Sequence, residues 1–193
     1  MTAYEFNLRG TNVLFPTDHG YMLRSALSKP FPFLHGRHDI QIAPLRGTRT
    51  VPGMCKLDKG STLHIRGLTP DEANLISEHG YFFLNGQQVW IEGCRERTLT
   101  PSTQLVSRLV LFRDHVDPEE FLKALTEKLP VGVLFSVGRS HAAVIKTNPI
   151  RRWKGYTVTL TNMTPEQSIL IQQTGIGHGK SMGCGVFYPG TIG

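Results

Sequence analysis

The sequence predicts an α+β protein made of two tandem ferredoxin-like domains, each with the element order β-α-β-β-α-β, and a C-terminal glycine-rich loop. The first observation behind this prediction is an internal repeat, because residues 68–80 and 163–175 carry the same helix start and stop signals. The second is that strand-like and helix-like segments follow the same order around both copies. We therefore expect domains at 1–97 and 98–193, the second carrying the loop.

The repeated segment has the signals of a capped helix. Thr69 and Thr164 are suited to the N-cap, and a proline follows each at the first helical position. Glu72 and Gln167 stand three residues after these threonines, which is the spacing of a capping box. Each segment ends on a glycine, which readily adopts the left-handed conformation that closes a helix. Two helices with the same signals predict two copies of one unit.

The other elements of the first half follow in order along the chain. A strand is expected at 4–15 and a helix at 19–28, on the spacing of their apolar residues. Asn85-Gly86 is typical of the tight turn of a β-hairpin. The remaining strands are expected at 39–44, at 62–67 and, after the capped helix, in a hairpin that ends near residue 91.

The second half begins with a strong strand pattern at 105–113. Asp117 then opens a helix, since proline and two glutamates follow it. The apolar face of this helix is expected to comprise Phe121, Leu122, Leu125 and Leu129. Further strands are expected at 131–137 and 156–160 and, after the second capped helix, near 184–188.

The charge of the chain favours a polyanionic partner. Its 193 residues include 21 Lys and Arg against 15 Asp and Glu, a formal net charge of +6. Such an excess favours nucleic acid, because cations that contact phosphates release condensed counterions. The N-terminus has no basic segment followed by an apolar run, and no apolar stretch approaches the ~18 residues that span a bilayer. We expect a cytoplasmic protein that contacts no membrane.

Residues 174–185, T-G-I-G-H-G-K-S-M-G-C-G, form the glycine-rich loop. Its Gly-Lys-Ser ending resembles a P-loop, but Thr174 occupies the position that requires the first glycine. The loop also leaves a helix and enters a strand, the reverse of a P-loop, so no nucleotide cofactor is expected. Glycines let backbone N–H groups approach a phosphate, although a tight connection without a ligand explains them as well. The candidate phosphate-binding residues here are Gly175, Gly177, His178, Gly179, Lys180, Ser181 and Gly183.

Cations outside the loop supply further candidates for binding a phosphate backbone. Arg151, Arg152 and Lys154 surround Trp153, and such a mixture of cations and an aromatic ring suits both phosphates and bases. The alternative is a solvated loop with a half-buried tryptophan. Arg108, within the strand at 105–113, is another candidate.

The sequence lacks the patterns of the common hydrolases. There is no H-E-x-x-H motif, no G-x-S-x-G elbow and no His/Cys cluster with metal-ligand spacing. The cysteines, Cys55, Cys94 and Cys184, include no C-x-x-C pair, which fits a reducing compartment. Histidine remains as the acid or base. Among eight histidines, His19 lies where the first strand gives way to the first helix, and His35 follows that helix.

These residues carry a family resemblance that spans nearly the whole chain. The motif P-x-D-H-x-Y-x-L, then a short helix and L-H, resembles the N-terminal region of the CRISPR-associated repeat-specific endoribonucleases of the RAMP superfamily. The similarity is greatest to the short variant group labelled MYXAN. The matching residues are Pro16, Asp18, His19, Tyr21, Leu23, Leu34 and His35, then Thr98-Leu99, residues 107–110, Arg151-Arg152, residues 168–172, and the loop with its following strand.

The resemblance implies metal-independent cleavage of CRISPR repeat RNA in a precursor transcript, which gives mature guide RNAs. A 2′-hydroxyl would attack the neighbouring phosphate while histidine transfers protons, leaving 2′,3′-cyclic phosphate and 5′-hydroxyl ends. The family's catalytic histidine commonly lies at the end of the first helix, which maps onto His35; His19 is the second choice and His38 the third. Lys29 and Arg37 can supply charge to the transition state, and Arg37 is also a candidate RNA contact.

The resemblance implies no metal and no cofactor. The expected partners are CRISPR repeat RNA or guide RNA and other subunits of an effector complex. One rival function is a non-catalytic, guide-RNA-binding RAMP subunit of such a complex. A more distant rival is a ferredoxin-like protein that binds a small molecule.

Overall fold

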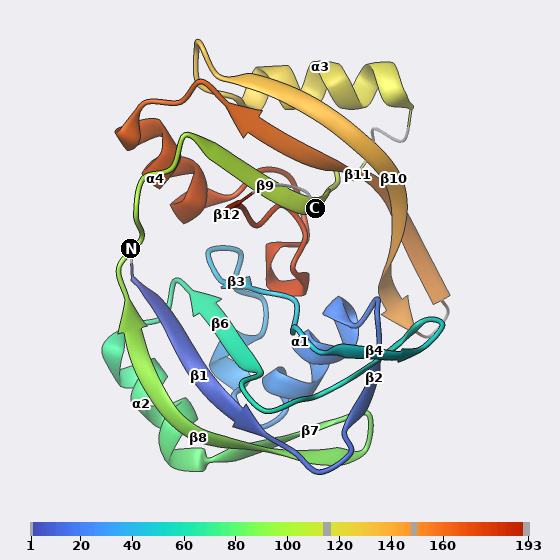
Figure 1. The fold of residues 1–193 in the computed structure, drawn as a ribbon, viewed down its shortest axis with the longest axis vertical. Coiled ribbons are helices and arrows are strands. Elements are labelled where there is room, and N and C mark those ends of the chain that lie inside the picture. The colour runs from blue at the N-terminus through green and yellow to red at the C-terminus, as the bar shows by residue number, and fades with distance from the viewer. Residues whose placement is uncertain (1, 114–116, 148–149, 191–193) are drawn as a thin grey trace. The chain divides into compact units, whose positions relative to one another are not determined.

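The structure, a computed structural model, describes residues 2–113, 117–147 and 150–190. The chain divides into two compact units, Met1–Thr98 and Leu99–Gly193. Each unit contains an antiparallel sheet and two α-helices (Figure 1). Every helix in the described ranges is too short or too polar to cross a membrane.

The first unit is built on a five-stranded antiparallel sheet with the order β3-β6-β1-β8-β7. Strands β1, β3, β6 and β8 with the two helices follow the β-α-β-β-α-β order, and β7 adds an edge strand. A second, small sheet has the order β2-β5-β4. The bounds are β1 (Ala3–Arg9), β2 (Leu14–Pro16), α1 (Gly20–Ser28), the 3₁₀ turn η1 (Pro32–Leu34), β3 (Gln41–Ile42), β4 (Thr48–Val51), β5 (Met54–Lys56), β6 (Thr62–Arg66), α2 (Pro70–His79), β7 (Tyr81–Leu84) and β8 (Gln87–Arg97).

The core of the first unit lies on the face of its sheet that the helices cover. Phe6 on β1 is fully buried in one cluster with Leu27 of α1 and Ile76 of α2. Because successive strand residues point to opposite faces, the neighbour of Phe6, Glu5, lies on the other face of β1. Packing thus separates an apolar face from a polar one.

The second unit has a four-stranded sheet with the order β10-β11-β9-β12, and its elements also follow the β-α-β-β-α-β order. Phe121, Leu125 and Ile171 of its helices share one buried cluster with Leu160 of β11. β10 and β11 form a long hairpin (Figure 1). The bounds are β9 (Gln104–Val110), α3 (Pro118–Lys128), β10 (Leu134–Thr147), β11 (Ile150–Thr161), α4 (Pro165–Thr174), the 3₁₀ turn η2 (Lys180–Met182) and β12 (Tyr188–Pro189).

The predicted α+β, tandem ferredoxin-like fold is confirmed, and so are both capped helices. Thr69 accepts a hydrogen bond from the backbone N–H of Glu72 while the Glu72 side chain accepts from that of Thr69. Thr164 and Gln167 make the same pair of bonds. These reciprocal bonds satisfy N–H groups that a helix start otherwise leaves unpaired.

Several element bounds differ from the prediction. The strand expected at 4–15 ends at Arg9, and the β4–β5 hairpin was not expected because its side chains are exposed or half-buried and show no alternation. Val131 is 96% exposed, so β10 begins later, at Leu134. Leu122 was wrongly placed on the buried face of α3, where Ala124 packs instead. The last strand begins only at Tyr188, because the glycine-rich loop extends further than predicted.

A buried carboxylate organises the polar face of the first sheet. Glu5 is only 4% exposed and pairs in register with His64 on β6 and Arg95 on β8. Arg95 and Arg97 both form ion pairs with it, Arg97 with an Nε–Oε2 distance of 3.0 Å. Burial alone would raise the pKa of Glu5, but hydrogen bonds from Arg97 and Arg95 outweigh it and lower the pKa. Burial lowers the pKa of nearby His64.

We predict that Glu5→Gln lowers the free energy of unfolding at pH 7 by about 2 kcal/mol, the scale of hydrogen bonds to a charged group. A carboxylate with a lowered folded-state pKa stabilises the fold above its unfolded pKa of about 4.3 and loses that contribution as the pH falls through the folded value. Urea unfolding of both proteins at pH 7 and near pH 3 should therefore show the difference shrinking in acid.

The matched control is Glu92→Gln, because Glu92 pairs with Arg9 on the exposed surface. Its effect should stay within about 0.5 kcal/mol. An equally large Glu5→Gln effect at both pH values would show that packing, not ionisation, is what Glu5 contributes.

Candidate active site and nucleic-acid interface

A hollow of about 250 Å³ lies over the exposed face of α1. Tyr21, Arg24, Ser25 and Ser28 line it, spaced so that they share one face of a helix. The opposite face of α1, with Leu23, is buried in the core. Packing of α1 therefore directs two hydroxyl groups, a phenol and a guanidinium into one space.

His35 reaches the same hollow from the segment that follows α1. Phe31 and Leu34 are buried, and the His35 backbone N–H donates to the Pro32 carbonyl oxygen over 2.9 Å, which closes the η1 turn. The His35 side chain is exposed and lines the hollow together with Lys29, the residue after α1. The structure thus brings a histidine, a lysine and an arginine to one surface.

Ser28 has an orphaned hydroxyl at this surface. Its Oγ is buried and has no hydrogen-bond partner among the residues that the structure describes. A buried hydroxyl without a partner is costly, and most are paired with protein or water. The Ser28 hydroxyl therefore lies unsatisfied beneath the surface of the hollow.

His19 is placed differently, because both of its ring nitrogens bind the backbone. The Leu45 N–H donates to His19 Nε2 over 2.8 Å, so Nδ1 carries the proton and donates to the Pro16 carbonyl oxygen over 2.9 Å. The side chain is 3% exposed and packs edge-on against Phe15 with ring centroids 4.8 Å apart. This geometry suits a residue that ties the start of α1 to the segment before β4.

His38 is exposed and is not among the residues that line the hollow. Of the three candidate histidines, only His35 is both exposed and part of the lining of the hollow, together with Arg24 and Lys29.

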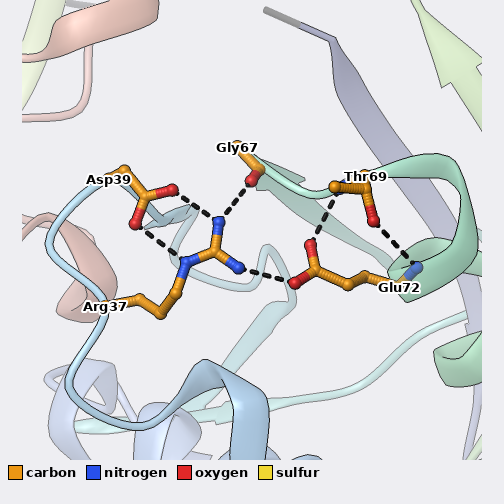
Figure 2. Close-up of polar contacts among 5 residues, drawn as sticks. All are labelled: Arg37, Asp39, Gly67, Thr69 and Glu72. Carbon is orange, nitrogen blue, oxygen red and sulfur yellow. Dashed lines mark hydrogen bonds and ion pairs between the residues drawn. The ribbon is translucent and has the colours of Figure 1, made fainter.

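Arg37, a candidate RNA contact, is held by protein groups (Figure 2). Its Nε and Nη2 donate to the two Asp39 oxygens over 2.9 and 2.5 Å, and Nη1 donates to Glu72 over 2.6 Å. Nη2 also donates to the Gly67 carbonyl oxygen. The hydrogen bonds to Asp39, with the charges of Asp39 and Glu72, raise the pKa of Arg37 above its usual value. Since Glu72 also caps α2, Arg37 joins the segment after His35 to the start of α2.

In the second unit, the glycine-rich loop packs against the end of β9 and the residue that follows it. The His178 N–H donates to the Leu111 carbonyl oxygen over 2.9 Å, and the Gly185 N–H donates to that of Leu109. A Cβ at Gly177 would lie 2.5 Å from the Leu111 oxygen, and one at Gly185 only 1.9 Å from a backbone oxygen. Both glycines also have positive φ. Packing and backbone conformation therefore require them, whatever the loop binds.

The tip of the loop retains groups that can bind an anion. Within the described part of the chain, the N–H groups of Gly179, Lys180 and Ser181 have no hydrogen-bond partner. Lys180 Nζ donates to the Thr174 carbonyl oxygen over 2.8 Å at the end of α4, which uses one of its three donors. Gly175 and Gly183, which also have positive φ, turn the chain on either side of this tip.

The predicted basic cluster on β11 is divided between two faces of the strand. Trp153 packs with Leu109, Leu111 and Cys184, on the side of the glycine-rich loop. Alternation along the strand places Arg151 on that side and Arg152 and Lys154 on the other, where the Lys154 ammonium lies over the Tyr156 ring. Arg108 is exposed on β9. The cluster therefore supplies two separate cationic surfaces.

A residue that the sequence analysis missed, Arg113, completes the surface beside the loop. Its guanidinium carbon lies 5.5 Å from the centroid of the Trp153 ring, and its backbone N–H donates to His178 Nδ1 over 3.2 Å. The Trp153 and His178 rings meet at 76° with centroids 6.5 Å apart. Position next to a predicted strand end was the only signal in the sequence. Cations and rings side by side suit a nucleic-acid strand.

The fold and these surfaces define the class of protein. A solved structure named "An RAMP protein binding different RNA substrates" aligns with a TM-score of 0.70 and 12% identity, over 97% of this chain and 98% of its own. A second, "CRISPR associated protein Cas6", aligns with a TM-score of 0.69 and 13% identity, over 98% and 99%. At such low identity these likenesses establish the fold alone, which is that of two tandem ferredoxin-like domains.

Sequence comparison gives the family. The model described as Cas6 Crispr matches residues 3–191. A relative from Myxococcus xanthus (strain DK1622), "CRISPR-associated endonuclease Cas6", is 30% identical over 178 residues, which cover 90% of this chain and 76% of the relative. The chain therefore belongs to the Cas6 family of CRISPR-associated endoribonucleases, and the resemblance found in the sequence is confirmed.

We predict that Arg37→Ala lowers the free energy of unfolding by about 2–3 kcal/mol, because it leaves Asp39 and Glu72 without their shared partner. Arg37→Lys should recover only part of this loss, since lysine cannot reproduce the guanidinium fork. Urea unfolding measures both, and the exposed Arg152→Ala is the control, expected within about 0.5 kcal/mol. If Arg37→Ala instead kept its stability but bound RNA weakly, Arg37 would be an RNA contact after all.

Proposed function

We propose that this protein cleaves the repeat in CRISPR precursor transcripts without a metal ion, through attack by the 2′-hydroxyl on the adjacent phosphate. In this reaction O2′ bonds to phosphorus, the bond from phosphorus to O5′ breaks, and the products carry 2′,3′-cyclic phosphate and 5′-hydroxyl ends. One group must accept the 2′-hydroxyl proton and another must protonate O5′. The observation that carries the proposal is the hollow over α1, where an exposed His35 lies beside two cations.

Four of the lining residues have a chemical part in this proposal. His35 transfers a proton, and the Tyr21 hydroxyl is a candidate for a second proton donor or acceptor on the same surface. Arg24 and Lys29 stabilise the extra negative charge that develops on the phosphate oxygens in the transition state.

RNA binding is assigned chiefly to the second unit. The loop tip around Lys180 offers free N–H groups, and Arg113 with Trp153 adds a cation stacked on a ring. A solved structure of the same fold is named as binding different RNA substrates, which supports RNA as the ligand of this chain. Other subunits of an effector complex are the further partners that we propose for the RNA-bound protein.

We expect His35→Ala to bind repeat RNA with unchanged affinity but to cleave it at least about 10²-fold more slowly, because a proton-transfer group is lost. The measurement is single-turnover cleavage of labelled repeat RNA in excess EDTA. A parallel RNA with a 2′-deoxy residue at the cut site should not be cleaved by either protein, because it has no nucleophile.

His38→Ala is the matched control, since His38 is exposed three residues away and lies outside the hollow. It should cleave at nearly the wild-type rate. Normal cleavage by His35→Ala would remove His35 from the mechanism. Tight binding by the wild-type protein with no cut at all would instead favour the non-catalytic RNA-holding function.

We expect Lys180→Ala to weaken binding of all RNA sequences and to lower the slope of affinity against salt concentration by about 1, as for the loss of one phosphate contact. The measurement is affinity for the 2′-deoxy RNA at several salt concentrations. Lys123→Ala on α3 removes a cation far from the loop in the same unit and should leave the slope unchanged. An intact slope in Lys180→Ala would exclude the loop tip as a phosphate site.

A further inference from the structure

A second hollow adjoins the first at the end of α1. It has a volume of about 260 Å³ and is lined by Ala26, Lys29 and Pro30 from the end of α1, with His79, Tyr81, Phe82 and Phe83 from the end of α2 and from β7. Lys29 lines both hollows. The two hollows are therefore neighbours, and the residue that they share carries a positive charge.

The rings around the second hollow form a continuous aromatic surface. His79 stacks on Tyr81 with centroids 4.7 Å apart and an interplanar angle of 26°. Tyr81 meets Phe83 edge-on at 5.9 Å and lies 5.7 Å from Trp90, its cross-strand partner on β8. Phe31 meets His79 edge-on from the other side. We call Tyr81, Phe83 and Trp90 the aromatic platform.

The core does not account for the aromatic platform. Phe82 and Leu84, which alternate with it along β7, are buried, whereas Phe83 is 55% and Trp90 44% exposed. Large aromatic side chains that stay exposed to water lack the hydrophobic stabilisation that burial gives to Phe82 and Leu84. Clustered exposed rings of this kind mark binding surfaces.

The geometry points to a nucleobase-binding subsite: we propose that a base next to the scissile phosphate of the RNA stacks on the aromatic platform while Lys29 contacts the phosphate between the two hollows. A base offers a flat π-face, which aromatic side chains bind with little regard to sequence. Its phosphate carries the negative charge that complements Lys29. The adjacency of the two hollows at Lys29 supports this occupant. If a phosphate of the RNA strand lies at His35, the next nucleotide must lie in an adjoining space.

This inference rests on the proposed function, because it places a base in the second hollow only when the scissile phosphate is bound in the first. A second copy of this chain is the other occupant that an exposed aromatic surface suits. An apolar protein surface would leave Lys29 without a partner, whereas the RNA backbone supplies one at the shared wall. The two occupants also differ in what they predict for an RNA that lacks a single base.

The test measures the affinity of the full chain for repeat RNA with a 2′-deoxy residue at the cut site, together with RNAs that each carry one abasic position near the cut. Phe83→Ala should weaken binding of the intact RNA about tenfold, the scale of losing one base–aromatic stack. Phe83→Leu, which keeps apolar area but no ring, should weaken it comparably, and Phe83→Tyr should restore it.

The decisive result is coupling between the ring and one base. The loss caused by Phe83→Ala should disappear with the RNA that is abasic at a single position beside the cut, and persist with the others. Leu75→Ala is the control, because Leu75 is 53% exposed on α2 and lies outside the second hollow. It should bind every RNA like the wild type.

Unchanged affinity in Phe83→Ala, or an equal loss with every abasic RNA, would overturn the proposal. A Phe83→Ala protein that binds RNA normally but sediments differently from the wild type would assign the platform to self-association and also overturn it. Because the RNA is uncleavable, this outcome is independent of catalysis. Failure of the wild-type protein to cut normal RNA would count against the proposed function while leaving the coupling result valid.

Discussion

The burial of one face of α1 is the constraint on which the candidate active site depends. Leu23 and Leu27 are sealed in the core of the first unit, so the helix cannot turn about its axis without exposing them to water. The direction of every side chain on the opposite face follows from this. Lys29, one residue beyond the helix, is held at the wall between two hollows by the same packing. Hydrophobic burial of one face of α1 thus positions the polar side chains of its other face, which line the hollow.

The two units share an order of elements and differ in the segment that is lengthened. In the first unit, the chain between α1 and β6 includes η1 and three short strands, and His35 lies there. In the second, the glycine-rich loop lengthens the connection from α4 to β12. Regular elements give a rigid frame, and irregular segments on that frame carry binding groups. The internal repeat corresponds to the helices and strands that the two units share. The candidate sites lie in the segments that the two units do not share.

Local features were predictable from the sequence, and long-range ones were not. The capping boxes at Thr69 and Thr164 form because their partners lie three residues away. By contrast, Arg37 meets Glu72 across 35 residues, and of its side-chain partners only Asp39, two residues on, lies near it in the sequence. The cations around Trp153 belong to two faces, which only the bounds of β11 reveal. The aromatic platform was missed for the same reason, since it needs the pairing of β7 with β8.

The close packing of the glycine-rich loop limits which of its positions can change. At Gly177 and Gly185 any side chain would collide with backbone oxygen atoms, so these positions cannot acquire a new contact group. Variation is left to the positions between them that already carry side chains, chiefly His178 and Lys180. The loop therefore combines a backbone that cannot change with a few side chains that can. If it binds RNA as proposed, these few positions are the ones to randomise in engineering a new RNA preference.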